Sequence, residues 1–77
     1  MNNTVNGAHF VVCVNNRGYP AALEVRKIYR RLADSKATRM GMVRVVDESG
    51  EDYLYPASFF MPIRLSATIV RALRRRR

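Results

Sequence analysis

The chain has few of the residues from which small domains build disulfides or metal sites. It holds one cysteine, one histidine and no tryptophan in 77 residues. A single cysteine cannot form an internal disulfide, so a fold without disulfides in a reducing compartment is expected. Cys13 lies in an apolar run with no second cysteine or basic residue beside it, which favours a buried, unreactive thiol. His9 has no partner at ligand spacing, which argues against a zinc site.

Long apolar segments are also missing, and no lysine or arginine precedes Arg17. A secretory signal peptide needs a basic start and an apolar stretch, and a membrane-spanning helix needs about 20 mostly apolar residues. We therefore expect neither feature, and we predict a cytoplasmic protein with no membrane partner.

No group of side chains has the composition of a catalytic site. A serine nucleophile needs a neighbouring base and an oxyanion site, but every serine stands in a turn or helix-cap context. The serines are Ser35, Ser49, Ser58 and Ser66. We expect no catalytic residue, no metal ligand and no cofactor, and we predict that the protein is not an enzyme.

Acidic residues are scarce, and most of them stand together. Four of the six are Asp47, Glu48, Glu51 and Asp52. Carboxylates can bind a divalent cation, but this run lacks the spaced ligands of a dedicated calcium loop. We interpret it as a solvated turn.

Basic residues are abundant and unevenly placed. The net charge is +8, and five of the fourteen lysines and arginines lie in residues 71–77. Without that segment nine basic residues face six acidic ones, which leaves a net charge of only +3. The sequence thus predicts a molecule with an acidic turn and a basic C-terminal end.

Length and hydrophobic content indicate one small folded domain. Of all residues 48% are hydrophobic, which is too high for a disordered chain, and 77 residues form a single core. We divide the chain into a disordered leader at residues 1–7, a domain at residues 8–73 and a basic tail at residues 74–77.

Short apolar runs between turn residues predict a mainly β fold. We expect strands at residues 8–14, 42–46, 51–55 and 61–65, the last beginning at or after Pro62. The stretch 40–60 is central, because it holds a hairpin and its turn at residues 47–50. It then enters a Pro-led tight turn at residues 56–60.

Helical structure is expected in two places. Residues 33–41 are polar and form a loop, with one helical turn started by Asp34 or Ser35. Ser66 is placed to cap a C-terminal helix with an apolar stripe of Ile69, Val70 and Leu73. We expect this helix to cover one open end of a small barrel.

The segment at residues 22–33 fits two patterns. As a helix, it has an apolar stripe of Ala22, Val25, Ile28, Tyr29 and Leu32 opposite its basic residues. As a strand, it places alternate side chains on opposite faces. Periodicity favours the helix, but the turn before it and the hairpin after it need a sheet partner. We prefer the strand and leave the helix open.

Residues 53–63, with the sequence YLYPASFFMPI, resemble the end of a Src-homology-3-type barrel, where a strand enters a Pro-x-x-aromatic turn and then a last strand. The resemblance implies a mainly β fold, a small five-stranded barrel with a short C-terminal helix. Residues 10–73 are also similar to a small bacterial family of proteins of about this size. That likeness implies a bacterial host and a fold, and it implies no activity.

The same resemblance suggests a ligand face. Pro56 and Phe59 match two positions of the peptide groove, but the chain lacks the tryptophan and the Ala-Leu-Tyr-Asp-Tyr-like segment of that groove. We therefore do not expect binding of proline-rich peptides. An aromatic surface of Tyr19, Tyr53 and Tyr55 can still hold an extended ligand. The function predicted is a small, non-enzymatic binding module.

The basic residues suggest an alternative, which is weak, sequence-tolerant binding of RNA or DNA. Its candidate residues are Arg26, Lys27, Arg30, Arg31, Arg71, Arg74, Arg75, Arg76 and Arg77. Two other interpretations stay open, a solubilising helix end and a dock for an acidic protein. We expect a monomer or a weak dimer paired through an exposed sheet edge.

Overall fold

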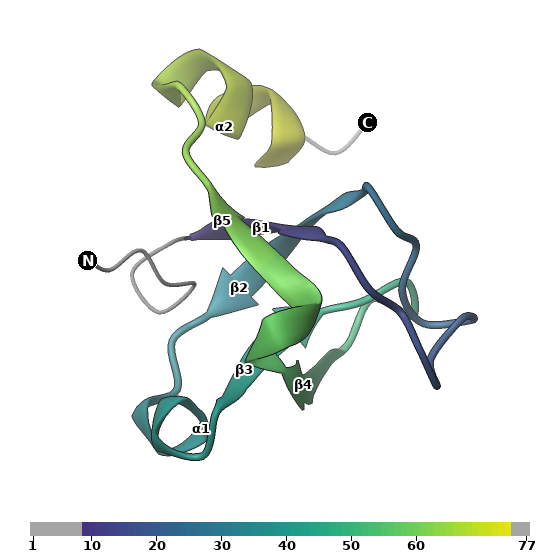
Figure 1. Ribbon diagram of the computed structural model, residues 1–77. Coiled ribbons are helices and arrows are strands. Elements are labelled where there is room, and N and C mark those ends of the chain that lie inside the picture. The colour runs from purple at the N-terminus through teal and green to yellow at the C-terminus, as the bar shows by residue number, and fades with distance from the viewer. Residues whose placement is uncertain (1–8, 75–77) are drawn as a thin grey trace.

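The computed structural model describes residues 9–74, and the predicted leader and most of the tail lie outside them. Five antiparallel strands form one sheet in the order β4-β3-β2-β1-β5. Two helices and a short 3-10 turn complete the chain (Figure 1). The elements are β1 Phe10–Cys13, β2 Ile28–Leu32, α1 Ser35–Arg39, β3 Met42–Val46, β4 Asp52–Pro56, the 3-10 turn Ala57–Phe59, β5 Phe60–Ile63 and α2 Ala67–Arg74. The predicted fold class, mainly β with five strands and a short C-terminal helix, is confirmed.

The sheet is strongly curled. Strand β2 pairs with β1 through residues 28–30 and with β3 through residues 31–32, so it belongs to both halves of the sheet. Tyr55 on β4 and Phe60 on β5 come from opposite edges, yet their ring centroids are 6.3 Å apart. The edges of a flat five-stranded sheet would be about 19 Å apart. The curl therefore turns the two edges toward one core, although no β4–β5 ladder occurs in the described residues.

The core collects side chains from all five strands and one loop. Its fully buried or nearly buried members are Val11, Cys13, Leu23, Tyr29, Val43, Val45, Tyr55 and Phe60. Alternate positions supply them, as Val43 and Val45 do on β3, because successive side chains of a strand point to opposite faces. The prediction of a buried cysteine is confirmed, and burial raises the pKa of the Cys13 thiol.

The ambiguous segment is a strand over only part of its length. The strand prediction is confirmed for Ile28–Leu32. It is wrong for residues 23–27, which form an irregular loop with a turn at Val25 and Arg26, and the helical alternative is wrong. Arg26 has a left-handed φ of 77°, and its N–H donates to the carbonyl of Cys13 at 2.7 Å. This left-handed residue interrupts any regular helix or strand. Leu23 still enters the core, but from the loop.

The other strand predictions hold within a residue or two, with one correction. The hairpin strands are Met42–Val46 and Asp52–Pro56, and the predicted Pro-led turn is the 3-10 turn Ala57–Phe59. The last strand begins at Phe60 and includes Pro62, whereas we expected it to begin at or after Pro62. A proline fits inside β5 because β5 is an edge strand, and its outer side pairs with no other strand of the described sheet.

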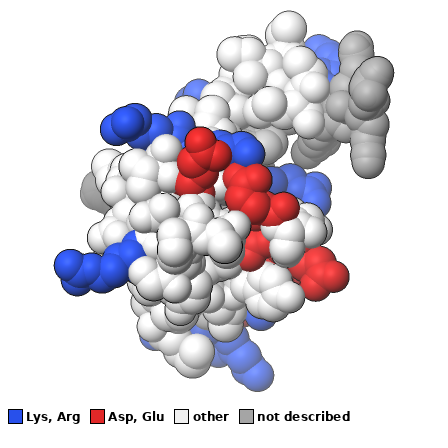
Figure 2. All heavy atoms as spheres, turned by 90° about the vertical axis from the view of Figure 1, so that its right-hand side faces the viewer, with Lys and Arg blue, Asp and Glu red and all other residues white. Residues whose placement is uncertain are grey.

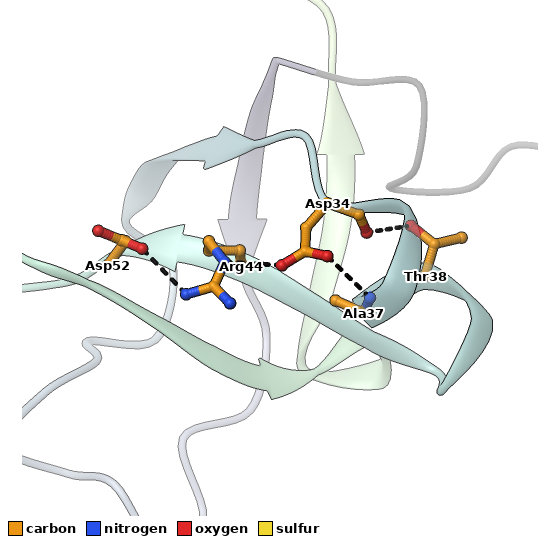
Figure 3. A network of polar contacts seen from close by, with 5 residues as sticks. All are labelled: Asp34, Ala37, Thr38, Arg44 and Asp52. Atoms are coloured by element: carbon orange, nitrogen blue, oxygen red, sulfur yellow. Dashed lines mark hydrogen bonds and ion pairs between the residues drawn. The ribbon is translucent and has the colours of Figure 1, made fainter.

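Helix α1 begins at Ser35 and is capped by Asp34, in agreement with the prediction of a helical turn started by Asp34 or Ser35. The Asp34 carboxylate accepts a hydrogen bond from the N–H of Ala37 at 3.0 Å and from Arg44 Nε at 2.8 Å (Figure 3). The Nη1 atom of Arg44 also lies 3.0 Å from Asp52 Oδ2. The cap and the Arg44 bond lower the pKa of Asp34. One arginine thus ties α1 to both hairpin strands.

Helix α2 begins where predicted but does not cover the core. Ser66 Oγ accepts a hydrogen bond from the N–H of Ile69 at 3.2 Å, which confirms the cap. Ile69 is 47% exposed and Leu73 is 52% exposed, so the expectation that this stripe closes the barrel is wrong. The helix stands apart from the sheet in Figure 1. Strand β5 ends at the margin of the sheet, and three residues lead from there into α2.

Candidate binding groove

Two segments far apart in the sequence meet at one end of the molecule: loop 15–27, which follows β1, and hairpin turn 47–51, which joins β3 to β4. The N–H of Glu48 donates to the carbonyl of Ala22 at 3.0 Å. Lys27 Nζ lies 2.7 Å from Glu48 Oε2. The Tyr29 hydroxyl donates to the same oxygen at 2.5 Å and accepts from the N–H of Glu24 at 2.8 Å. Glu48 therefore fastens the turn to the loop.

These bonds shift the protonation of the groups that make them. Hydrogen bonds from Lys27 and Tyr29 lower the pKa of Glu48. The Glu48 hydrogen bond raises the pKa of Lys27 in return. Burial, reinforced by the bond to Glu48, raises the pKa of Tyr29, so its hydroxyl stays a donor at neutral pH. Glu48 and Lys27 are thus both charged at neutral pH.

Asp47 is the buried acid of the turn, with 6% of its surface exposed. Its carboxylate accepts from the Tyr55 hydroxyl at 2.5 Å, from the Ser49 hydroxyl at 2.6 Å and from the Ser49 N–H at 2.8 Å. Burial acts to raise the pKa of Asp47, but the bonds from Ser49 and Tyr55 outweigh it and hold the pKa below its usual value. Burial followed by the Asp47 bond raises the pKa of Tyr55.

An open groove of about 580 Å³ lies between the loop and the hairpin. This is within the size range of pockets that bind small ligands or single side chains, about 300–1,000 Å³. It is lined by Tyr19, Ala21, Ala22, Asp47, Glu48, Ser49, Tyr53, Leu54 and Tyr55. Tyr19 stands edge-on to Tyr55 with ring centroids 4.9 Å apart. Aromatic and acidic residues thus line the same groove.

The predicted ligand face is partly assembled here. Tyr19, Tyr53 and Tyr55 all line the groove, but Tyr55 is only 3% exposed and contributes little surface. Pro56 and Phe59 do not line it. Phe59 packs against the core, with its ring centroid 6.2 Å from that of Tyr19, and Pro56 is the last residue of β4.

The predicted nucleic-acid residues belong to separate elements. Lys27 is paired with Glu48, Arg26 lies in the loop, and Arg30 is exposed on β2. Arg31 follows on β2 in register with Val45, and Arg71 is exposed on α2. Arg74 ends α2, and Arg75, Arg76 and Arg77 lie outside the described residues.

The interpretation of the acidic run as a purely solvated turn is wrong for two of its four members. Asp47 is buried under Tyr55, and Glu48 bonds to Tyr29 and Lys27. The partners come from outside the turn, from β4 for Asp47 and from β2 and loop 15–27 for Glu48, so the composition of the turn does not reveal them. One sequence feature could have indicated the contact: Tyr55 lies on the strand that follows the acidic turn, within reach of Asp47. Figure 2 shows the acidic side chains gathered on this side of the molecule.

Within residues 9–74, no three His, Cys, Asp or Glu side chains converge to hold a metal ion. None of the described helices is long and apolar enough to cross a membrane. Comparison with known protein families, curated proteins and solved structures gives no match for this chain.

Proposed function

We propose that the protein is a small, non-enzymatic binding module whose groove holds an extended peptide with a basic side chain. One observation carries this proposal: two exposed tyrosines and two acidic residues line the same open groove. Tyr19 is 43% exposed and Tyr53 is 50% exposed, and Glu48 and Asp47 lie beside them. Aromatic rings and carboxylates together suit an arginine or lysine side chain.

The charge around the groove is slightly negative. Loop 15–27 and residues 42–56 hold five acids, Glu24, Asp47, Glu48, Glu51 and Asp52, against four basic residues, Arg17, Arg26, Lys27 and Arg44. A long, flexible basic side chain can lay its stem on a tyrosine ring and keep its charge near the carboxylates. The groove is rigid for a loop site, because Glu48 and Asp47 hold its walls.

The test is titration of a ¹⁵N-labelled full chain with an extended arginine-containing peptide and with the same peptide carrying glutamine for arginine. We expect backbone shifts at residues 19–22 and 47–55 with the first peptide only. Tyr53→Ser removes a groove wall and weakens the interaction. Met40→Ser is the matched control, because Met40 is an exposed apolar residue, 65% exposed, outside the groove. Shifts scattered over the surface, or equal binding of both peptides, would refute the proposal.

Weak binding of RNA or DNA is the second candidate. It is favoured by Arg26, Arg30 and Arg71, which have no carboxylate partner in the described part of the chain. Binding through phosphates weakens steeply with salt. We expect an oligonucleotide to bind at low salt and to lose affinity when residues 71–77 are removed. Binding that is absent at low salt, or unchanged by the truncation, would exclude this candidate.

The barrel family, the bacterial host and the cytoplasmic location are also parts of this proposal. The strand order, the acidic hairpin and the 3-10 turn before β5 support a Src-homology-3-type barrel, and the resemblance to a small bacterial family suggests a bacterial host. The single buried thiol of Cys13 is consistent with a cytoplasmic location.

A further inference from the structure

Charge divides the molecule into two parts. All six acidic residues lie outside β1, β2, β5 and α2, in loop 15–27, at the start of α1 and along the hairpin. From Tyr53 to the end of the sequence there are six arginines and no acid. On the face shown in Figure 2, no acidic atom lies on the lobe that carries α2. The part of the molecule that consists of β1, β2, β5 and α2 therefore has no negative side chain.

The same part exposes apolar side chains. Val12 on β1 is in register with Ile28 on β2 and with Met61 on β5, so the three form a row across the sheet. They lie on the face opposite to core residue Val11, and Met61 is 54% and Ile28 36% exposed. The solvated face of an antiparallel sheet is usually polar. This outer row is apolar, and two of its three side chains, Met61 and Ile28, are exposed.

Helix α2 repeats that combination. At about 100° per residue, Ile69, Val70 and Leu73 share one side of the helix, and Arg71 lies on the other. Ile69 and Leu73 are about half exposed, and α2 projects from the sheet in Figure 1. Both the apolar and the basic side of the helix are accessible to a partner.

We propose that α2, with the outer row beside β5, binds the surface of a membrane that contains anionic lipids. An amphipathic basic helix inserts its apolar side at the level of the headgroups, and its arginines attract the negative surface. This differs from the expectation drawn from the sequence, which considered only spanning segments. The inference is independent of the groove, because no residue of α2 lines it.

Two other partners account for only part of the surface. Nucleic acid would use the arginines but leave Ile69 and Leu73 in water. A second copy facing this surface would bury the apolar side chains but bring arginine against arginine, since this part of the chain has no acid to pair with them. An anionic lipid surface satisfies both the apolar side chains and the charges.

The experiment is sedimentation of the full chain with vesicles of phosphatidylcholine alone or of phosphatidylcholine mixed with phosphatidylserine, at low and at physiological salt. We expect binding to the mixed vesicles, little to the neutral ones, and a loss on adding salt. Leu73→Ser and Ile69→Ser should each weaken binding roughly tenfold, the effect of removing one inserted apolar side chain. Arg71→Gln should weaken it about fivefold.

Matched controls separate this surface from general stickiness. Tyr53→Ser removes a side chain of similar exposure from the groove, and Lys36→Gln removes one exposed charge from α1; both should bind vesicles like the wild type. We expect unfolding curves of the serine variants to match that of the wild type, because the core cluster contains no residue of α2.

Three outcomes overturn the proposal. The first is no binding to anionic vesicles at low salt. The second is binding that Leu73→Ser and Ile69→Ser leave unchanged, with an RNA oligonucleotide displacing the vesicles, which assigns the arginines to phosphate in general. The third is a self-associated chain that Leu73→Ser dissociates and that does not bind vesicles, which assigns the surface to a second copy.

Discussion

Loop 15–27 and α2 both lie outside the strands of the sheet, but only the loop is held to the sheet by buried side chains and hydrogen bonds. The loop is held by Glu48, by the buried side chain of Leu23 and by the Arg26 bond to β1. Helix α2 is joined through three residues and leaves Ile69 and Leu73 exposed. The comparison shows that apolar content alone does not decide whether a segment packs. What matters is whether its side chains face a concave part of the curled sheet.

Two leucine-to-alanine substitutions test this difference between loop 15–27 and α2 most directly. Leu23→Ala removes a fully buried side chain and should lower the free energy of unfolding by about 2–5 kcal/mol. Leu73→Ala removes a half-exposed one and should change it by less than about 0.5 kcal/mol. Urea unfolding followed by circular dichroism measures both. Similar losses for the two variants would mean that α2 packs on the body in solution.

Acid should weaken the interactions of three carboxylates, those of Asp47 and Glu48 in turn 47–51 and that of Asp34 at the start of α1. The pKa values of Asp47, Glu48 and Asp34 are lowered in the folded chain, so their contribution to stability is fully present above their unfolded pKa values of about 4. It is lost as the pH falls through the lower folded values. We expect the melting temperature to decline below about pH 4.

Asp47→Asn tests which carboxylate matters. It should lower the free energy of unfolding at pH 7 by about 1–3 kcal/mol, because Tyr55 and Ser49 lose a charged acceptor, and it should flatten the acid decline. Thermal unfolding from pH 7 to pH 3 provides both readings. An unchanged acid decline in this variant would assign the pH dependence to other groups.

The smallest effect concerns the left-handed backbone at Arg26. Glycine adopts a positive φ without the steric cost that an L-residue pays, so Arg26→Gly should be about 1 kcal/mol more stable than Arg26→Ala. At Arg30, in regular β2, the order should reverse. Chemical unfolding of the four variants decides this. The same order at both positions would argue against a left-handed Arg26 in solution.

Local patterns were sufficient for much of this fold. The hairpin, the Pro-led turn and the caps at Asp34 and Ser66 each depend on residues within a few positions of one another, and each was predicted. The sequence failed where the outcome depends on distant contacts. The start of β2 at Ile28 depends on the hydrogen bond from the N–H of Arg26 to the carbonyl of Cys13, a residue of β1.

The candidate groove was predictable only in part, for the same reason. Tyrosines suggested an aromatic surface, and Tyr19 and Tyr53 do line one groove. The roles of Asp47 and Glu48 were missed, because Tyr55 reaches Asp47 only when the hairpin forms and Tyr29 reaches Glu48 from another strand. An exposed acid and a buried acid of the same turn have the same neighbours in the sequence, so the sequence does not tell them apart.

The positions of two prolines have a consequence for how the protein behaves at high concentration. Pro56 lies on β4 and Pro62 on β5, and these strands are the two edges of the sheet. A proline has no N–H to offer an incoming strand, so each edge is a poor template for strand addition. The two prolines therefore disfavour the edge-to-edge strand pairing from which amyloid fibrils grow.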